Sequence, residues 1–279
     1  MTVLIAGCGD LGTEIGVRFA STGRRVYGIR RSPLKLPAAI TGIGADLGRE
    51  VPTVPPETEI VVMATAADGR TERAYRTAYL DALQNLLDGL GRGQIRPRRF
   101  LFVSSTSVYG SSDGWIDEDT PTAPTAATAA ILRDAETLLH RRMAQATVLR
   151  LTGLYGPGRT RLIDQVRDGS AVIADPDRWT NRIHRDDAAA AIVHLTTIDT
   201  VPEPIYIGVD DQPATRGTVL RFLADELDST PPVPAEGNEP PSGRRCRNDR
   251  LTATGFQFRY PTYRDGYRAI LAGDGVRHP

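Results

Sequence analysis

The sequence of 279 residues is long enough for one large domain, or for a domain with a smaller lobe, that buries a hydrophobic core. Its 34 lysine and arginine residues equal its 34 aspartate and glutamate residues, so the chain lacks the net positive charge by which proteins bind nucleic acids or anionic membranes. Two cysteines cannot build a disulfide framework, and no apolar run is long enough to span a membrane, so we expect a globular cytoplasmic protein that acts on a small molecule.

Strands and helices are predicted to alternate from the first residues onward. Residues 3–6 form a short apolar run bounded by glycine, which is typical of a buried parallel strand. Leu11, Ile15 and Phe19 then recur every four residues, which predicts a helix that ends near Gly23. Further strands are predicted at 26–29, near 43, at 60–64, at 100–103 and at 148–151, with helices over 70–90 and 126–143. This alternation predicts an α/β fold with a Rossmann-like doubly wound parallel sheet.

A glycine-rich turn joins the first strand to the first helix. Residues 7–12 read Gly-Cys-Gly-Asp-Leu-Gly, which is the G-x-G-x-x-G pattern in the strand–turn–helix context that gives it meaning. The glycines permit a tight turn and close approach of the backbone to a pyrophosphate, and the helix N-terminus supplies positive potential. We therefore expect a dinucleotide to bind at Gly7, Gly9, Asp10, Leu11 and Gly12.

The end of the second predicted strand indicates which dinucleotide is preferred. A site for NAD usually places an acidic residue there to bind the ribose 2′-hydroxyl, whereas this sequence has Arg30, Arg31 and Ser32. Guanidinium groups can form paired hydrogen bonds to a 2′-phosphate, which a carboxylate would repel. We expect NADP(H) to be preferred over NAD(H). The alternative is that these two arginines are only an exposed pair in a loop.

The sequence beyond residue 152 is less regular and contains a proline-rich loop at 231–241. We expect residues 1–152 and 182–210 to form the dinucleotide-binding domain. Residues 153–181 and 211–279 are expected to form a smaller C-terminal lobe that binds the substrate.

Several ordered motifs resemble the extended short-chain dehydrogenase/reductase family, which includes NAD-dependent epimerases and dehydratases. Besides the glycine turn, the resemblance rests on residues 46–47, 64–67, 104–110, 149–158, 181–187 and 260–266. It implies that Asp46 and Leu47 lie at the adenine, and that Ala64, Thr65 and Ala66 lie beside the cofactor.

The sequence departs from this family at the catalytic dyad Tyr-x-x-x-Lys, in which the lysine lowers the pKa of the tyrosine. Aligned on the helix after the fifth strand, Thr128 replaces the tyrosine and Leu132 replaces the lysine. The loss of the lysine does not depend on the alignment, because the only lysine is Lys35. Since a threonine hydroxyl is a poor general acid, Thr128 is expected at most to form a hydrogen bond. The chain therefore resembles an atypical member of the family.

The remaining catalytic candidates are hydroxyl groups. Ser105 matches the serine with which the family polarises the reacting oxygen, and a serine that only satisfies backbone groups is the alternative. Tyr109 and Tyr155 are candidates to replace the missing proton donor, although each can equally be an ordinary buried tyrosine. The histidines show no metal-binding spacing, so we expect no metal site.

These features predict an NADP(H)-binding oxidoreductase that reduces a carbonyl, an imine or an activated double bond of a small molecule. A non-redox dinucleotide-binding regulatory or sensor protein and a redox-neutral isomerase or cyclase remain alternatives. Thr180 stands where related nucleotide-sugar enzymes often have a phosphate-binding arginine, which weakens a nucleotide sugar as substrate. The arginines between 244 and 250 are either an anion clamp or a solvated face. The resemblance also implies a possible homodimer through the helices at 70–90 and 126–143.

Overall fold

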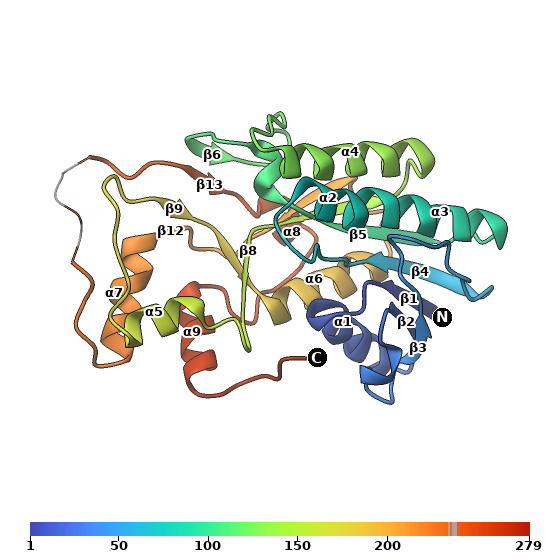
Figure 1. Ribbon diagram of the computed structural model, residues 1–279, viewed down its shortest axis with the longest axis horizontal. Coiled ribbons are helices and arrows are strands. Elements are labelled where there is room, and N and C mark those ends of the chain that lie inside the picture. Colours follow the sequence, from blue (N-terminus) through green and yellow to red (C-terminus); the bar gives the residue numbers. More distant parts are fainter. Residues whose placement is uncertain (234, 236–238) are drawn as a thin grey trace.

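A parallel sheet of seven strands crosses the centre of the computed structural model, which describes residues 1–233, 235 and 239–279 (Figure 1). In spatial order its strands are β11 (Ile205–Gly208), β7 (Thr147–Leu151), β5 (Arg99–Ser105), β4 (Thr58–Met63), β1 (Thr2–Ala6), β2 (Arg25–Arg30) and β3 (Thr41–Gly44). All neighbours pair in parallel. The strand order reverses between β1 and β4, where open α/β sheets bind their ligands. The predicted doubly wound sheet is confirmed.

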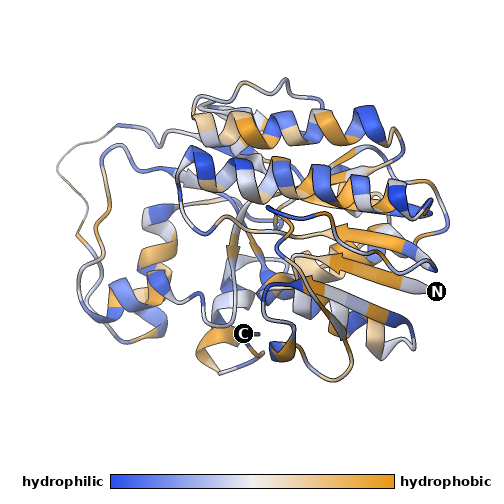
Figure 2. Ribbon diagram, turned by 45° about the vertical axis from the view of Figure 1, so that its right-hand side comes forward, coloured by the Kyte–Doolittle hydropathy of each residue, from blue (hydrophilic) through white to orange (hydrophobic). Residues whose placement is uncertain are grey.

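The middle residues of the central strands are mostly apolar, since both faces of the sheet are covered (Figure 2). Every residue of β1 is buried. Alternate residues of β1 face opposite sides, so Leu4 joins one hydrophobic core and Ile5 joins another. The continuous apolar runs of the sequence therefore reflect two cores that share one sheet.

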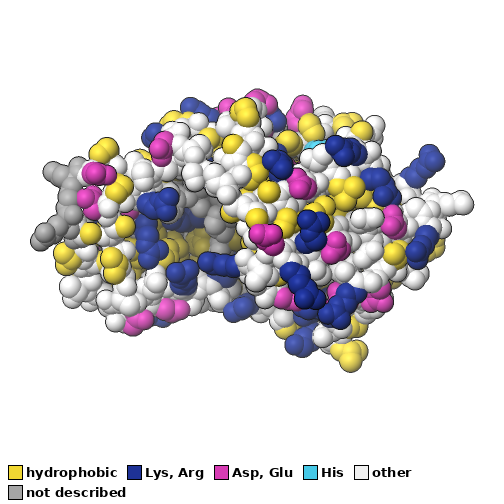
Figure 3. All heavy atoms as spheres, turned by 45° about the horizontal axis from the view of Figure 1, so that its top comes forward, with side chains coloured by type: hydrophobic (Ala, Val, Ile, Leu, Met, Phe, Trp, Pro, Cys, Tyr) yellow, Lys and Arg dark blue, Asp and Glu magenta, His cyan; other side chains and the backbone are white. Residues whose placement is uncertain are grey.

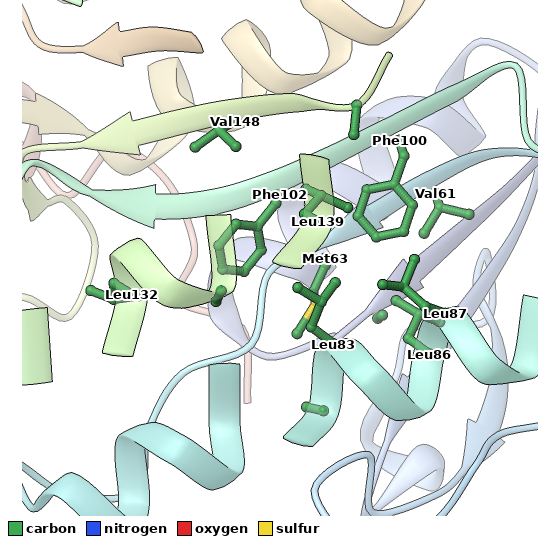
Figure 4. Packing of buried hydrophobic residues seen from close by; sticks show 14 of the residues in the cluster. Val61, Met63, Leu83, Leu86, Leu87, Phe100, Phe102, Leu132, Leu139 and Val148 are labelled. Atoms are coloured by element: carbon green, nitrogen blue, oxygen red, sulfur yellow. The ribbon is translucent and has the colours of Figure 1, made fainter. Parts of the chain in front are cut away.

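Helices cover both faces of the sheet (Figure 1). One face carries α1 (Asp10–Ser21) and α6 (Arg185–Thr197). The other carries α2 (Glu72–Tyr75), the π-helical stretch η2 (Arg76–Asp81), α3 (Ala82–Arg92) and α4 (Ala127–Arg142). The helix predicted over 70–90 is thus the continuous run of α2, η2 and α3. Figure 4 shows its leucines and those of α4 packed against β4, β5 and β7.

The C-terminal lobe has its own small core. Its helices are α5 (Arg161–Arg167), α7 (Arg216–Glu226) and α9 (Tyr263–Leu271). Three two-stranded ribbons lie outside the central sheet: β8 (Gly153–Tyr155) with β10 (Arg182–His184), β9 (Trp179–Thr180) with β12 (Ala214–Thr215), and β6 (Gly114–Ile116) with β13 (Arg244–Cys246). The short helices are η1 (Pro33–Lys35) between β2 and β3, η3 (Thr106–Tyr109) after β5, and α8 (Asp249–Thr252) before α9. The expected lobe range and the proline-rich loop both contain residues 234 and 236–238, which lie outside the described residues. None of the described helices is both long enough and apolar enough to cross a membrane.

Candidate functional site

A cleft of about 870 Å³ lies at the carboxyl ends of β1, β2 and β4, where the strand order reverses. Apart from Gly12, every residue predicted to bind the dinucleotide lines this cleft. These residues are Gly7, Gly9, Asp10, Leu11, Arg30, Arg31, Ser32, Asp46, Leu47, Ala64, Thr65 and Ala66. The fold thus brings together residues from four separate segments of the sequence.

The glycine turn has the geometry of a cradle for a ligand. Gly7 has a φ of 87°, and a Cβ atom there would lie 2.6 Å from the backbone nitrogen of Thr65. A Cβ atom on Gly12 would lie 2.5 Å from the carbonyl oxygen of Gly7, so these two glycines are required for close packing of the backbone. Gly9 differs, because its Cβ would meet nothing within 4 Å. Gly9 is also the N-cap of α1 and has no side chain to cap the helix, so the first amide groups of α1 can donate to an anion.

Asp10, the first residue of α1, is held by cations from distant parts of the chain. Its carboxylate accepts hydrogen bonds from Arg185 at 2.9 Å and from Arg159 at 3.1 Å. Arg185 is 1% exposed, whereas Arg159 lines the cleft. These guanidinium groups offset the negative charge that Asp10 places at the N-terminus of α1. Sequence reasoning missed Arg159, because only the fold brings it to the glycine turn.

The arginines at the end of β2 have partners of their own. Arg31 donates two hydrogen bonds to Asp68, at 2.6 and 3.0 Å, and Arg30 donates one to the carbonyl oxygen of Pro279 at 2.9 Å. The side chains of Arg31 and Asp68 are 63% and 69% exposed. An ion pair this exposed contributes only ~0–1 kcal/mol, so a bound phosphate could replace Asp68 at little cost. Lys35 lines the same end of the cleft.

Ser105 ends β5 and is the N-cap of η3. Its Oγ accepts a hydrogen bond from the backbone nitrogen of Ser107 at 3.1 Å, and its own hydroxyl hydrogen remains able to donate to a ligand. Thr128 lies half-buried in the first turn of α4. Neither side chain is among those that line the dinucleotide cleft.

Leu132, which the family resemblance aligns with the lysine of the dyad, is 2% exposed and lies in the core between α4 and the sheet (Figure 4). A lysine ammonium at this depth would be costly to bury without a partner. Leu132 instead packs α4 against the hydrophobic core of the sheet.

Tyr109 belongs to a buried polar network. Arg150 donates a hydrogen bond to its hydroxyl oxygen at 2.8 Å and forms an ion pair with Glu136 at 2.7 Å. Glu136 also accepts a hydrogen bond from Ser104 at 2.6 Å. Burial raises the pKa of Tyr109 to about 12, against the opposing effect of Arg150. The structure places this phenol inside the domain and away from the cleft.

Tyr155 is buried in the C-terminal lobe. Its ring lies 4.8 Å from that of Tyr267 and 5.3 Å from that of His184, measured between centroids. Its hydroxyl lies over Gly266 of α9, where any Cβ atom would collide with it. Burial strongly raises the pKa of Tyr155. This phenol also does not line the dinucleotide cleft, so the structure brings neither predicted tyrosine to it.

The histidine of the 181–187 motif, His184, is buried and caps a helix. His184 is the N-cap of α6, and its Nδ1 accepts a hydrogen bond from the backbone nitrogen of Asp186 at 3.2 Å. Burial lowers the pKa of His184 to about 4, so the ring is neutral near pH 7. Within the described ranges, no three His, Cys, Asp or Glu side chains gather as metal ligands.

A second cavity, of about 820 Å³, lies at the amino ends of β5 and β7. It is lined by the end of α3 and by the segments that precede β5 and β7, and it contains none of the predicted site residues. Because ligands of open α/β sheets bind at the carboxyl ends of the strands, the cleft at the glycine turn is the candidate site.

Comparison with known proteins identifies the family. The sequence model of the NAD-dependent epimerase/dehydratase family matches residues 3–208. The chain belongs to this family. Its resemblance to extended short-chain dehydrogenases/reductases is therefore confirmed.

Two relatives of this epimerase/dehydratase chain extend over nearly its whole length. Protein YeeZ of Escherichia coli strain K12 is 28% identical over 271 residues, which cover 93% of this chain and 96% of YeeZ. A protein structure from Methylobacillus flagellatus with the same family description is 37% identical, with a TM-score of 0.80 and 98% of both chains covered. UDP-glucuronic acid 4-epimerase from Bacillus cereus, solved with NAD, covers 99% of both chains with a TM-score of 0.80. It is only 18% identical and shows the shared fold alone.

Proposed function

We propose that this epimerase/dehydratase-family chain is an NADP(H)-dependent oxidoreductase that reduces a carbonyl, an imine or an activated double bond of a small molecule. The observation that carries the proposal is the cleft in which an open backbone cradle at Gly9 and the Arg30–Arg31 pair face the same volume. A dinucleotide fits this arrangement, with its pyrophosphate at the N-terminus of α1 and its adenosine at the end of β2.

The preference for NADP(H) rests on the charges at the adenosine end. Arg30, Arg31 and Lys35 line that end and outnumber the carboxylates of Asp46 and Asp68. The Bacillus cereus epimerase with the same fold was solved with NAD, so NAD(H) is the natural competitor. A 2′-phosphate would replace Asp68 as the partner of Arg31 and gain two charge-assisted hydrogen bonds.

Within the proposed reaction, bound NADPH would supply a hydride to the electrophilic carbon of the substrate. Ser105 is half-buried and lies on the same face of β5 as Val103, which lines the cleft, so its hydroxyl hydrogen would donate to the substrate oxygen or nitrogen and stabilise the negative charge that develops there. Because Tyr109 and Tyr155 are buried away from the cleft, the proton that completes the reduction would come from water. One hydride and one proton then balance the reduction of one double bond.

Binding and turnover test the proposal separately. Calorimetric titration with NADPH and NADH is expected to show tighter binding of NADPH. Arg31→Ala should weaken the binding of NADPH about tenfold and leave the binding of NADH nearly unchanged. Arg25→Ala is the matched control, because Arg25 lies on the same strand but pairs with Glu57 outside the cleft. No binding of either coenzyme would refute the dinucleotide site.

Turnover is tested by the loss of NADPH absorbance with aldehydes, ketones, imines and enones. Ser105→Ala is expected to lower kcat by about tenfold or more with little change in NADPH affinity. Ser111→Ala, in the exposed loop after η3, is the control. Tight binding of NADPH without turnover of any of these compounds would overturn the reductase proposal and favour a non-redox role.

A further inference from the structure

Residues 274–279, which we call the strap, come after α9 of the C-terminal lobe and run to the side of α1 (Figure 1). A hollow separates the lobe from the sheet domain on the face shown in Figure 3, so the strap is one of the connections between the two parts. We propose that the strap is a positioning element of the coenzyme site, which holds Arg30 in the orientation that binds the 2′-phosphate of NADP(H). The inference rests on the proposed function and deepens it by naming a determinant of coenzyme preference.

The strap packs on the Gly-Pro-Gly turn at 156–158. Arg277 donates a hydrogen bond to the carbonyl oxygen of Gly158 at 3.1 Å, and any Cβ atom on Gly158 would collide with the side chain of Arg277. A Cβ atom on Gly275 would lie 2.7 Å from Cγ of Pro157. Both glycines also have a positive φ, which other residues rarely adopt. These close approaches fix the path of the strap.

The strap also contacts the first two turns of α1. The backbone nitrogen of His278 donates to Oδ1 of Asp10 at 3.1 Å, and the ring of His278 donates from Nε2 to Glu14 at 2.9 Å. The buried Arg185 links the helix to the strap, because it donates to Asp10 at 2.9 Å and to the carbonyl oxygen of Val276 at 2.7 Å. The strap is therefore fixed beside the helix whose N-terminus faces the coenzyme cleft.

The end of the strap holds Arg30, which lines the coenzyme cleft. Arg30 donates from Nη1 to the carbonyl oxygen of Pro279 at 2.9 Å. Arg31 differs, because Nη1 and Nη2 both donate to the carboxylate of Asp68. No aspartate or glutamate oxygen of the described residues lies within 4.0 Å of the guanidinium nitrogens of Arg30. The strap thus orients Arg30, and no acidic side chain neutralises it.

A guanidinium held in this way is prepared to bind a phosphate. The strap occupies Nη1 of Arg30, whereas Nε and Nη2 form the edge with which an arginine binds two oxygens of one phosphate. Binding that must first order a free arginine side chain loses affinity, and a side chain that is already held avoids this loss. We therefore expect the strap to strengthen NADPH binding through Arg30. NADH has no 2′-phosphate, so its binding should not depend on this contact.

Gly275→Ala tests the strap without changing a residue that lines the cleft, because its Cβ would collide with Pro157. Gly273→Ala is the matched control. Both glycines have a positive φ, 85° at Gly275 and 81° at Gly273, but a Cβ atom on Gly273 would meet nothing within 4 Å. In calorimetric titrations, Gly275→Ala should bind NADPH about fivefold more weakly than Gly273→Ala does and should bind NADH equally well. Equal weakening of both coenzymes would indicate a merely structural role and overturn the inference.

His278→Ala is a second, milder variant, because it removes the hydrogen bond from the ring to Glu14 and leaves the backbone contact with Asp10 in place. It is expected to fold normally and to weaken NADPH binding less than Gly275→Ala does, again without an effect on NADH. Comparing the melting temperatures of the three variants separates a loss of the strap contact from a loss of folding.

A double-mutant cycle tests whether the strap acts through Arg30. In the Arg30→Ala protein, adding Gly275→Ala should have no further effect on NADPH affinity. Additive losses would show that the strap acts elsewhere and would overturn the inference. Tighter binding of NADPH by Gly275→Ala would also overturn it, because Pro279 would then compete with the phosphate for Arg30.

Hydrogen exchange provides a readout that does not depend on turnover. Coupling between two sites is reciprocal, so NADPH should slow exchange at the backbone amide of His278 more than NADH does. Equal exchange with both coenzymes would contradict the inference. Equal affinity of the natural protein for NADPH and NADH would overturn the proposed coenzyme preference and this inference together. A preference for NADPH that Gly275→Ala and His278→Ala leave intact would overturn the inference alone.

Discussion

Asp210→Asn is the substitution whose effect can be worked out most fully from the structure. Asp210 is 1% exposed, its Oδ1 accepts a hydrogen bond from the backbone of Gln212 at 3.2 Å, and its Oδ2 has no partner within the described ranges. Burial raises the pKa of Asp210 from 3.8 to about 8, and the charge of Arg182 opposes this shift only in part. The folded protein therefore keeps this carboxyl protonated near neutral pH, and asparagine matches that neutral form in shape.

The sign and size of the effect follow from proton linkage. Between about pH 5 and pH 7 the folded state binds nearly one more proton at this site than the unfolded state does, so stability falls as the pH rises. The free energy of unfolding should fall by about 1.4 kcal/mol per pH unit from this group, or about 3 kcal/mol over the range. Asp210→Asn removes this dependence. Its stability relative to the natural protein should rise with pH by the same amount.

His184 has the opposite effect in the same range, because burial lowers its pKa from 6.5 to about 4. The unfolded state then binds more protons, so this group makes stability rise with pH up to about 6.5. In the natural protein, the opposite changes in unfolding free energy with pH that Asp210 and His184 cause offset each other. Since His184 is present in both proteins, its contribution cancels when the variant and the natural protein are subtracted.

The assay is urea unfolding followed by circular dichroism at about pH 5, 6 and 7. Asp225→Asn, on the exposed face of α7, controls for the substitution itself. The difference in unfolding free energy between Asp210→Asn and the natural protein should increase at each step. Parallel curves would show that Asp210 is ionised in the folded protein, and the reasoning would be refuted.

Four further predictions concern the glycine turn and the buried network. Gly9→Ala should leave the melting temperature nearly unchanged but weaken NADPH about tenfold, since its Cβ meets only open space where the ligand would lie. Gly12→Ala should lower both the melting temperature and the affinity for NADPH, because its Cβ collides with a backbone carbonyl. Equal calorimetric affinity for NADPH in Gly9→Ala and the natural protein would contradict a ligand site at Gly9. Glu136→Ala should cost about 3–5 kcal/mol in urea unfolding by leaving Arg150 buried and unpaired, and a loss below 1 kcal/mol would contradict this. Tyr109→Phe should cost about 1–2 kcal/mol by removing one hydrogen bond to Arg150, with kcat unchanged; a large fall in kcat would place Tyr109 in the reaction.

The sheet was predictable because its signals are local. The strands at 3–6 and 60–64 are apolar runs long enough to stand out, and the turn at 7–12 has a spacing with one common structural meaning. The sequence does not predict β11, because its four residues are a weak pattern in an irregular region. The two-residue strands β9 and β12 have no periodicity that sequence analysis can detect.

The sequence by itself determined the sheet apart from β11, the glycine turn and the missing dyad, because apolar runs, glycine spacing and a single lysine at position 35 are properties of the chain alone. Only the tertiary structure decided where the side chains point. It buried the hydroxyls of Tyr109 and Tyr155 and brought Arg159 to Asp10 across 149 residues. It also brought the glycine turn and the ends of β2, β3 and β4 together around one cleft. Burial and ion pairing depend on neighbours distant in sequence, so the chemistry of a hydroxyl or a guanidinium is set by packing that no local pattern records.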